Sequence, residues 1–164
     1  MKQLILIRHA KSSWAMPAME DIDRPLNDRG KKDAPVMAKR LLEKKINIDA
    51  FISSPAKRAK KTARLFTKEF GVDKKEIILS DELYMASTDA FYQVIENTKN
   101  KFETIAVFSH NPGITAFANL LTNLRIDNMP TCSVFAVKIA IDKWSDFRQA
   151  RKEFWLFDYP KAIS

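Results

Sequence analysis

The chain contains two histidines, His9 and His110, and each closely follows an apolar run. Arg8 precedes His9 after the run at residues 4–7, and Ser109 precedes His110 after the run at residues 104–108. A positioned imidazole can act as a nucleophile. A guanidinium is permanently charged and can bind two phosphate oxygens at once. Their combination predicts chemistry at a phosphoryl group.

A second arginine, Arg58, falls in the first turn of a helix predicted after Ser54-Pro55. The start of a helix offers free backbone N–H groups and the positive end of the helix dipole to an anion. The alternative is that Arg58 is one more solvated cation in the basic run at residues 57–61. Because Arg8 and both histidines also fall at predicted strand ends, we favour a phosphate-binding role.

The elements that must position these residues alternate between strand and helix patterns. Strands are predicted at 4–7, 50–53, 76–79, 104–108, 133–141 and 153–157, and helices at 27–45, 55–70, 88–97 and 112–121. This order predicts a three-layer α/β sandwich with a mostly parallel sheet, helices on both faces and an antiparallel edge formed by the last two strands. We expect one domain over residues 1–164. Ligands of such sheets bind beyond the carboxyl ends of the strands.

Two local features refine the first helix. Asn27 can cap its amino end, and Pro35 is expected to kink it or to mark a late start. Both lie in the segment that connects the first two strands.

Composition excludes several classes of protein. With 164 residues, 46% hydrophobic and 29% charged, the chain has the profile of a folded globular protein. It has no apolar run near the ~18 residues that span a bilayer, so no membrane partner is expected. The single cysteine, Cys132, fits a reducing cytoplasm. Two histidines, one cysteine and scattered glycines predict neither a common zinc site nor a nucleotide loop, so no metal or cofactor is expected.

The net charge of +8 favours anionic partners, which include phosphorylated substrates, acidic proteins and nucleic acid. No aromatic RNA-binding motif or helix-turn-helix supports nucleic acid, so none is expected. A basic module that binds nucleic acid or acidic protein stays as the alternative from another functional class.

Four ordered motifs between residues 5 and 113 carry a specific resemblance. They are Ile7-Arg8-His9-Ala10-Lys11-Ser12, Asp23-Arg24-Pro25-Leu26-Asn27-Asp28-Arg29-Gly30, Ser53-Ser54-Pro55-Ala56-Lys57-Arg58-Ala59 and Ser109-His110-Asn111-Pro112-Gly113. The set resembles the histidine phosphatase superfamily, whose fold is phosphoglycerate mutase-like. Within it, the small size and the motif variants are most similar to the SixA-type phosphohistidine phosphatases.

The resemblance implies a metal-independent phosphatase. His9 would be the nucleophile and become phosphorylated, and water would then release phosphate. Arg8, Arg58 and His110 would hold the phosphoryl oxygens, with His110 as a cation. Ser12 and Asn111 are further predicted phosphate contacts. The sequence leaves open which nitrogen of His9 attacks.

The proton donor and the substrate are the remaining expectations. Relatives of the mutase branch use a glutamate, and Glu82 is the candidate by position; its alternative is an ordinary surface carboxylate. The resemblance places Arg24 at the mouth of the site. The preferred substrate is phosphohistidine on a protein, and the alternative is a small phosphorylated metabolite, hydrolysed or transferred by mutase action.

Cys132 is unsuited to nucleophilic catalysis of the tyrosine-phosphatase kind. That chemistry needs an arginine six positions later, and position 138 is Lys138. A buried free thiol is the better interpretation. Trp14 either lines the site entrance or serves packing, and Asp21 and Asp23 are expected in a loop.

Overall fold

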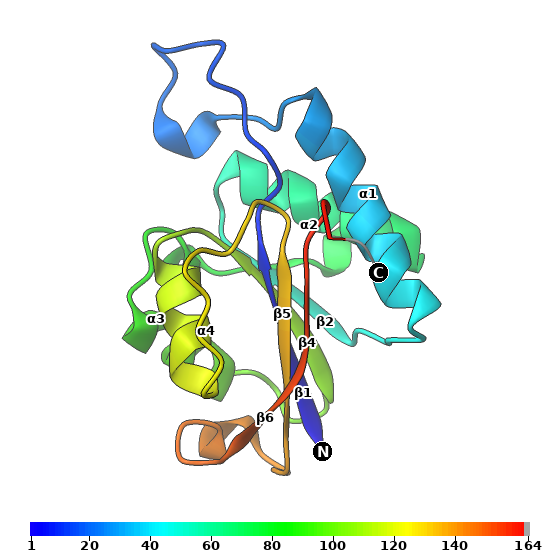
Figure 1. Cartoon of the computed structure of the whole chain (residues 1–164), viewed down its shortest axis with the longest axis vertical. Helices are drawn as coiled ribbons and strands as arrows, with labels where there is room; N and C mark the ends of the chain where they lie inside the picture. The colour runs from blue at the N-terminus through cyan, green and yellow to red at the C-terminus, as the bar shows by residue number, and fades with distance from the viewer. Residues whose placement is uncertain (163–164) are drawn as a thin grey trace.

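The computed structural model describes residues 1–162, which form one six-stranded sheet in the order β3-β2-β4-β1-β5-β6 (Figure 1). The strands are β1 (Lys2–Arg8), β2 (Ala50–Ser53), β3 (Ile78–Leu79), β4 (Thr104–Ser109), β5 (Val134–Ile139) and β6 (Lys152–Asp158). The first four run parallel, β5 pairs antiparallel with β1, and β6 pairs antiparallel with β5. The predicted fold class is confirmed.

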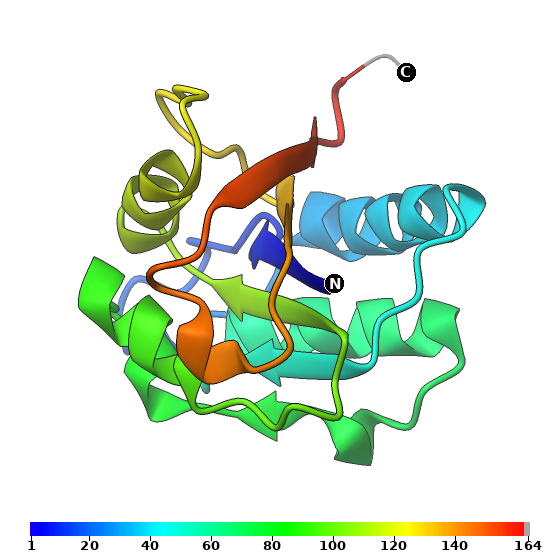
Figure 2. The same ribbon diagram turned by 90° about the horizontal axis from the view of Figure 1, so that it is seen from below.

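Helices cover both faces of this sheet, as Figure 2 shows. They are α1 (Asp28–Glu43), α2 (Lys57–Phe70), α3 (Thr88–Glu96) and α4 (Gly113–Leu121). Short 3₁₀ turns occupy Asp21–Asp23, Lys74–Glu76, Asp81–Leu83 and Trp144–Asp146. Among the described residues, no helix is both long enough and apolar enough to cross a membrane.

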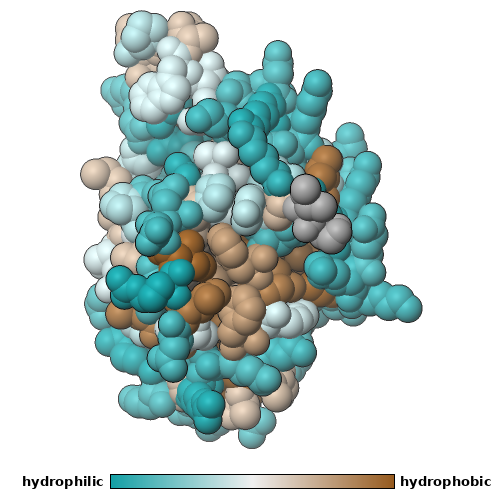
Figure 3. Space-filling model, viewed as in Figure 1, coloured by the Kyte–Doolittle hydropathy of each residue, from teal (hydrophilic) through white to brown (hydrophobic). Residues whose placement is uncertain are grey.

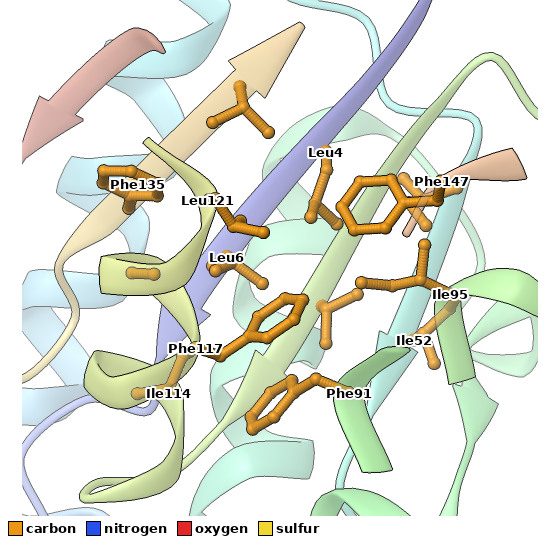
Figure 4. Packing of buried hydrophobic residues seen from close by; sticks show 14 of the residues in the cluster. Leu4, Leu6, Ile52, Phe91, Ile95, Ile114, Phe117, Leu121, Phe135 and Phe147 are labelled. Carbon is orange, nitrogen blue, oxygen red and sulfur yellow. The ribbon is translucent and has the colours of Figure 1, made fainter. Parts of the chain in front are cut away.

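The core is divided by the sheet because side chains alternate along each strand. Leu4 and Leu6 of β1 pack toward α3 and α4, where they meet Phe117 and other residues of the cluster in Figure 4. Ile5 and Ile7 of the same strand pack toward α1 and α2. Burial of β1 on both faces explains its unbroken apolar run and fixes the position of the residues that follow it.

Two details of the predicted elements differ from the structure. Asn27 caps α1 as expected, its Oδ1 accepting from Gly30 N at 2.9 Å, but the helix begins at Asp28 and continues through Pro35. A late start at Pro35 is therefore wrong. The third strand is only Ile78–Leu79, both exposed, because the residues before it form a 3₁₀ turn.

The β6 strand forms one edge of the sheet, and its face is partly apolar. Figure 3 shows apolar surface across the region that β6 and α4 occupy in Figure 1. Phe154 of β6 and Leu120 of α4 expose 44% and 58% of their surfaces. The site residues lie elsewhere, beyond the carboxyl ends of the parallel strands.

Candidate active site

One cavity of about 690 Å³ collects the predicted site residues beyond the ends of β1, β2 and β4. Its lining includes all six predicted phosphate contacts and catalytic residues other than Glu82: Arg8, His9, Ser12, Arg58, His110 and Asn111. They come from three segments separated in sequence, as expected for a crevice at the carboxyl edge of a parallel sheet.

His9 is held as one defined neutral tautomer. Its Nδ1 lies 2.7 Å from the carbonyl oxygen of Ala10. A carbonyl can only accept, so Nδ1 carries the proton and Nε2 keeps its lone pair. Burial is the main cause that lowers the pKa of His9 to about 3. Near neutral pH the imidazole is therefore uncharged and nucleophilic at Nε2.

The two arginines are anchored through their terminal nitrogens. Arg8 Nη1 donates to the carbonyl of Met129 at 2.8 Å, and Arg58 Nη1 donates to the carbonyl of Asp21 at 2.6 Å. The Nε of each guanidinium is buried and has no hydrogen-bond partner among residues 1–162. Burial, followed by the charge of Arg58, lowers the pKa of Arg8. Two cations held together with unpaired donors form a strong anion-binding arrangement.

His110 lies beside His9, with 5.0 Å between the ring centroids. Its Nε2 is 2.7 Å from Ser54 Oγ, whereas its Nδ1 is buried without a partner in the described chain. Burial first, then the neighbouring His9, lowers the pKa of His110 to about 3. His110 is therefore uncharged near neutral pH when no anion lies beside it, whereas the expected cationic form refers to a site that holds phosphate. A phosphoryl dianion placed beside it would raise this pKa.

Ser12 and Asn111 differ in their availability to a ligand. Ser12 Oγ accepts from Arg24 Nη1 at 2.8 Å, which leaves the hydroxyl proton available. The amide nitrogen of Asn111 donates to Asn128 Oδ1 and to the Met129 carbonyl, at 2.6 and 3.2 Å. Both of its donors are therefore occupied, and Asn111 holds the loop that accepts from Arg8.

The entrance to the cavity contains residues that the motifs did not single out as site residues. Asp21 Oδ2 accepts from Tyr84 Oη at 2.7 Å and from Arg58 Nη2 at 3.0 Å. The hydrogen bond from Tyr84 is the largest cause that lowers the pKa of Asp21. Arg24 donates to Asp21 Oδ1 at 2.8 Å and stacks on the Trp14 ring at 3.6 Å. Trp14 therefore lies at the entrance, one of the two alternatives that the sequence left open.

Close backbone packing fixes the segment that carries His9. A Cβ on Gly30 would lie 2.3 Å from the Lys11 carbonyl oxygen, so only glycine lets α1 approach this loop. Cys132 has a left-handed φ of 62°, and its N–H donates to the carbonyls of Arg8 and His9 at 3.0 Å. The Thr62 hydroxyl oxygen accepts from Ala10 N at 3.0 Å. Three separate elements thus hold the turn after β1.

Glu82 lies outside this cavity. Its carboxylate is fully exposed, accepts from Ser80 Oγ at 2.8 Å and lines a different depression that also contains Phe102. Cys132 is a buried free thiol, as predicted. Burial raises its pKa far above neutrality, which excludes a reactive thiolate.

Comparisons with known proteins relate the chain to one superfamily of enzymes. A model of the histidine phosphatase superfamily (branch 1) matches residues 4–84, which contain the first three motifs. The chain is therefore similar to this superfamily over residues 4–84, and the likeness supports a phosphatase that works through a histidine.

Curated relatives are similar over most of the chain. An uncharacterized chloroplastic protein of Arabidopsis thaliana is 27% identical over 155 residues, 88% of this chain and 70% of the relative. An uncharacterized protein of Mycobacterium tuberculosis is 27% identical over 150 residues, 85% of this chain and 90% of the relative.

Solved structures share the fold. The SixA protein of Nakamurella multipartitia superposes with a TM-score of 0.82 at 23% identity, covering 98% of this chain and 97% of that one. The protein histidine phosphatase SixA complexed with tungstate gives 0.81 at 20% identity, covering 96% and 97%. A mycobacterial glucosyl-3-phosphoglycerate phosphatase gives 0.67 at 12% identity, covering 95% and 98%.

Proposed function

We propose that this phosphatase hydrolyses phosphohistidine on a protein, by way of a phosphoenzyme formed at Nε2 of His9. The observation that carries the proposal is the hydrogen bond from Nδ1 of His9 to the Ala10 carbonyl. It fixes the proton on Nδ1 and leaves the Nε2 lone pair as the nucleophile.

In the first step, Nε2 of His9 attacks phosphorus in line with the substrate imidazole. The new P–N bond forms as the bond to the leaving nitrogen breaks. The leaving imidazole departs neutral when its remote ring nitrogen carries a proton, which can be taken from solvent before the reaction. Such a substrate needs no acid beside the scissile bond, and this is consistent with the position of Glu82 outside the cavity.

In the second step, water attacks phosphorus and the bond to His9 breaks. One proton of the water passes to the departing phosphate, and His9 returns to its starting tautomer. Charge on the three equatorial oxygens must be stabilised in both steps. The unpaired Nε–H groups of Arg8 and Arg58 are suited to this task. The Ser12 hydroxyl and His110 Nδ1, once His110 is protonated, are the further donors.

The preference for a protein substrate rests on the exposed entrance and on the likeness to SixA proteins. Trp14 and Met85 at the entrance expose 71% and 83% of their surfaces, which leaves room for a side chain presented by a larger molecule. A small phosphorylated metabolite is the second candidate, because the glucosyl-3-phosphoglycerate phosphatase has the same fold. A cytoplasmic location is part of the proposal.

The test is phosphate release from a phosphohistidine-bearing protein, with and without a chelator, by the parent enzyme and by His9→Ala. We expect release that the chelator does not affect and that the substitution abolishes. Release that persists in His9→Ala would remove His9 as the nucleophile. Turnover of sugar or glycerate phosphates but not of phosphohistidine would favour the second candidate.

A further inference from the structure

A second cavity, of about 560 Å³, adjoins the active site and is strongly basic. We call it the basic groove and define it by the five cations of its lining: Lys31, Lys57, Lys60, Lys61 and Arg64. Asp23 is the one carboxylate in the same lining. The groove is distinct from the phosphate cavity, whose arginines are Arg8, Arg24 and Arg58.

Helix α2 connects the two cavities. Lys57, Lys60, Lys61 and Arg64 recur at the spacing of one helix face. Arg58 lies on the opposite, buried face of the same first turn and enters the phosphate cavity. The 3₁₀ turn Asp21–Asp23 also borders both, because Asp21 lines the phosphate cavity and the next two residues line the groove. The two cavities are therefore neighbours, and a large substrate seated in the phosphate cavity could also reach the groove.

The charges of the groove are not neutralised by the protein itself. None of its five cations forms an ion pair with a carboxylate of residues 1–162. By contrast, Arg24 and Arg58 of the phosphate cavity are both paired with Asp21.

This arrangement works against the stability of α2. Cations near the amino end of a helix oppose its dipole, and the first turn of α2 contains no acidic residue. Lys57 and Lys61, like Lys60 and Arg64, are also like-charged pairs four residues apart, which destabilise a helix slightly. The presence of these unfavourable charges beside the active site points to a binding role.

We propose that the basic groove binds an acidic segment of the phosphoprotein substrate next to its phosphohistidine. The proposal rests on the proposed function and names the surface that selects the partner. Ile22, Pro25, Leu26 and Pro55 give the groove an apolar part that suits the stems of glutamate side chains. None of the lining residues is aromatic, so the groove lacks the stacking platforms of single-stranded nucleic acid sites.

The test uses two synthetic phosphohistidine peptides that differ only in a flanking run of Glu or of Gln, together with free phosphohistidine. The triple variant Lys57→Glu/Lys60→Glu/Lys61→Glu, the groove reversal, changes the sign of three charges in the groove. Lys44→Glu/Lys74→Glu/Lys75→Glu is the matched control, because it makes the same charge change at exposed lysines outside both cavities. Thermal melting checks the folding of each variant, and the Lys→Gln triple variant replaces the groove reversal if that reversal does not fold.

The wild-type enzyme should have a KM for the Glu peptide at least about tenfold below that for the Gln peptide. The groove reversal should remove this preference for the Glu peptide and leave kcat and the turnover of free phosphohistidine within about twofold of the wild type. The control variant should keep the preference for the Glu peptide. A peptide flanked by Lys should become the better substrate of the reversed enzyme. Equal KM values in the wild type, or equal losses in both triple variants, would overturn the proposal.

Two further arms separate the possible failures. Anisotropy measures binding of the unphosphorylated Glu peptide to His9→Ala, so the groove is tested even if phosphohistidine is not turned over. Absence of turnover together with groove-dependent peptide binding would refute the proposed function alone. Tighter groove-dependent binding of a single-stranded oligonucleotide than of the Glu peptide would overturn the acidic-segment proposal in favour of nucleic acid.

Discussion

The floor and the rim of the active-site cavity are built in different ways. The floor consists of Arg8, His9, Arg58 and His110, and the last three expose 7% of their surface or less. The rim consists of Trp14, Asp21, Tyr84 and Met85, which lie in loops and short turns. Floor residues follow strands or open a helix, whereas rim residues are held mainly by contacts between side chains.

This difference suggests that the floor carries out the phosphoryl transfer and that the rim selects the substrate. The buried floor offers a neutral nucleophile and unpaired donors, which suit any phosphoryl group. The exposed rim and the adjoining basic groove are placed where they would contact the molecule that carries that group. Substitutions in the floor should therefore impair all substrates alike, and substitutions in the rim should distinguish between them.

The largest effect is expected at His9. Replacing the proposed nucleophile, His9→Ala, should lower kcat by at least about 10⁴-fold for both protein and small substrates. Single-turnover phosphate release measures it. An equally folded variant with more than a tenth of the parent activity would contradict the floor assignment.

Arg58 comes next. Arg58→Ala removes a donor and a charge that act on the transferring group, and kcat/KM should fall about 10²–10³-fold. Arg58→Lys should restore little of it, because lysine cannot reproduce the forked contact with Asp21. If Arg58→Ala lowered kcat/KM only for the phosphoprotein, Arg58 would act in substrate selection, like the rim residues, and not in the reaction.

The buried histidines also make stability depend on pH. The native pKa values of His9 and His110, about 3 for each, lie below the value of about 6.5 in an unfolded chain. The unfolded state therefore binds protons first, and stability should fall as pH decreases from about 6.5 toward 3.

Melting curves provide the measurement. We expect the melting temperature to drop by at least about 4 °C between pH 7 and pH 4.5. The drop should be smaller in His9→Asn/His110→Asn. The same drop in this double variant would assign the pH dependence to other groups.

A smaller, substrate-dependent effect is expected at the rim. Trp14→Ala removes an exposed ring stacked on Arg24, a contact of about 0.5–1 kcal/mol. The KM for a phosphohistidine protein should rise about two- to fivefold, with free phosphohistidine unaffected. Equal changes in KM for both substrates would mean that Trp14 acts on the phosphoryl group, like the floor residues, and not on the protein that carries it.

The smallest effect is expected at Glu82. Its carboxylate is exposed and lies outside the cavity, so Glu82→Gln should change kcat for phosphohistidine less than about twofold. A large loss of kcat together with loss of the basic limb of the pH profile would instead support the proton-donor role that the sequence suggested.

The floor could be predicted from sequence because it depends on local patterns. A buried strand has a recognisable apolar run, and the residue after it must reach the carboxyl edge of the sheet. At the rim, the entrance position of Trp14 was one of two open alternatives, but the contact between Asp21 and Tyr84 could not be predicted. These two residues are 63 positions apart and meet through loop conformations that no periodicity encodes. The contacts between the carboxyl-terminal third and the site could not be predicted either. Met129 and Cys132 contribute backbone groups, and the partners of backbone groups are independent of side-chain type.

The central claim is that Nε2 of His9 takes the phosphoryl group. The most direct measurement is rapid quenching of the enzyme during turnover of a ³²P-labelled phosphohistidine protein, followed by mapping of the acid-labile label and separation of the two phosphohistidine isomers. The account predicts one labelled residue, His9, as the Nε2 isomer, and no label in His9→Ala. Label on Nδ1 of His9, label on another residue, or turnover with no phosphoenzyme detectable on the timescale of the reaction would contradict it.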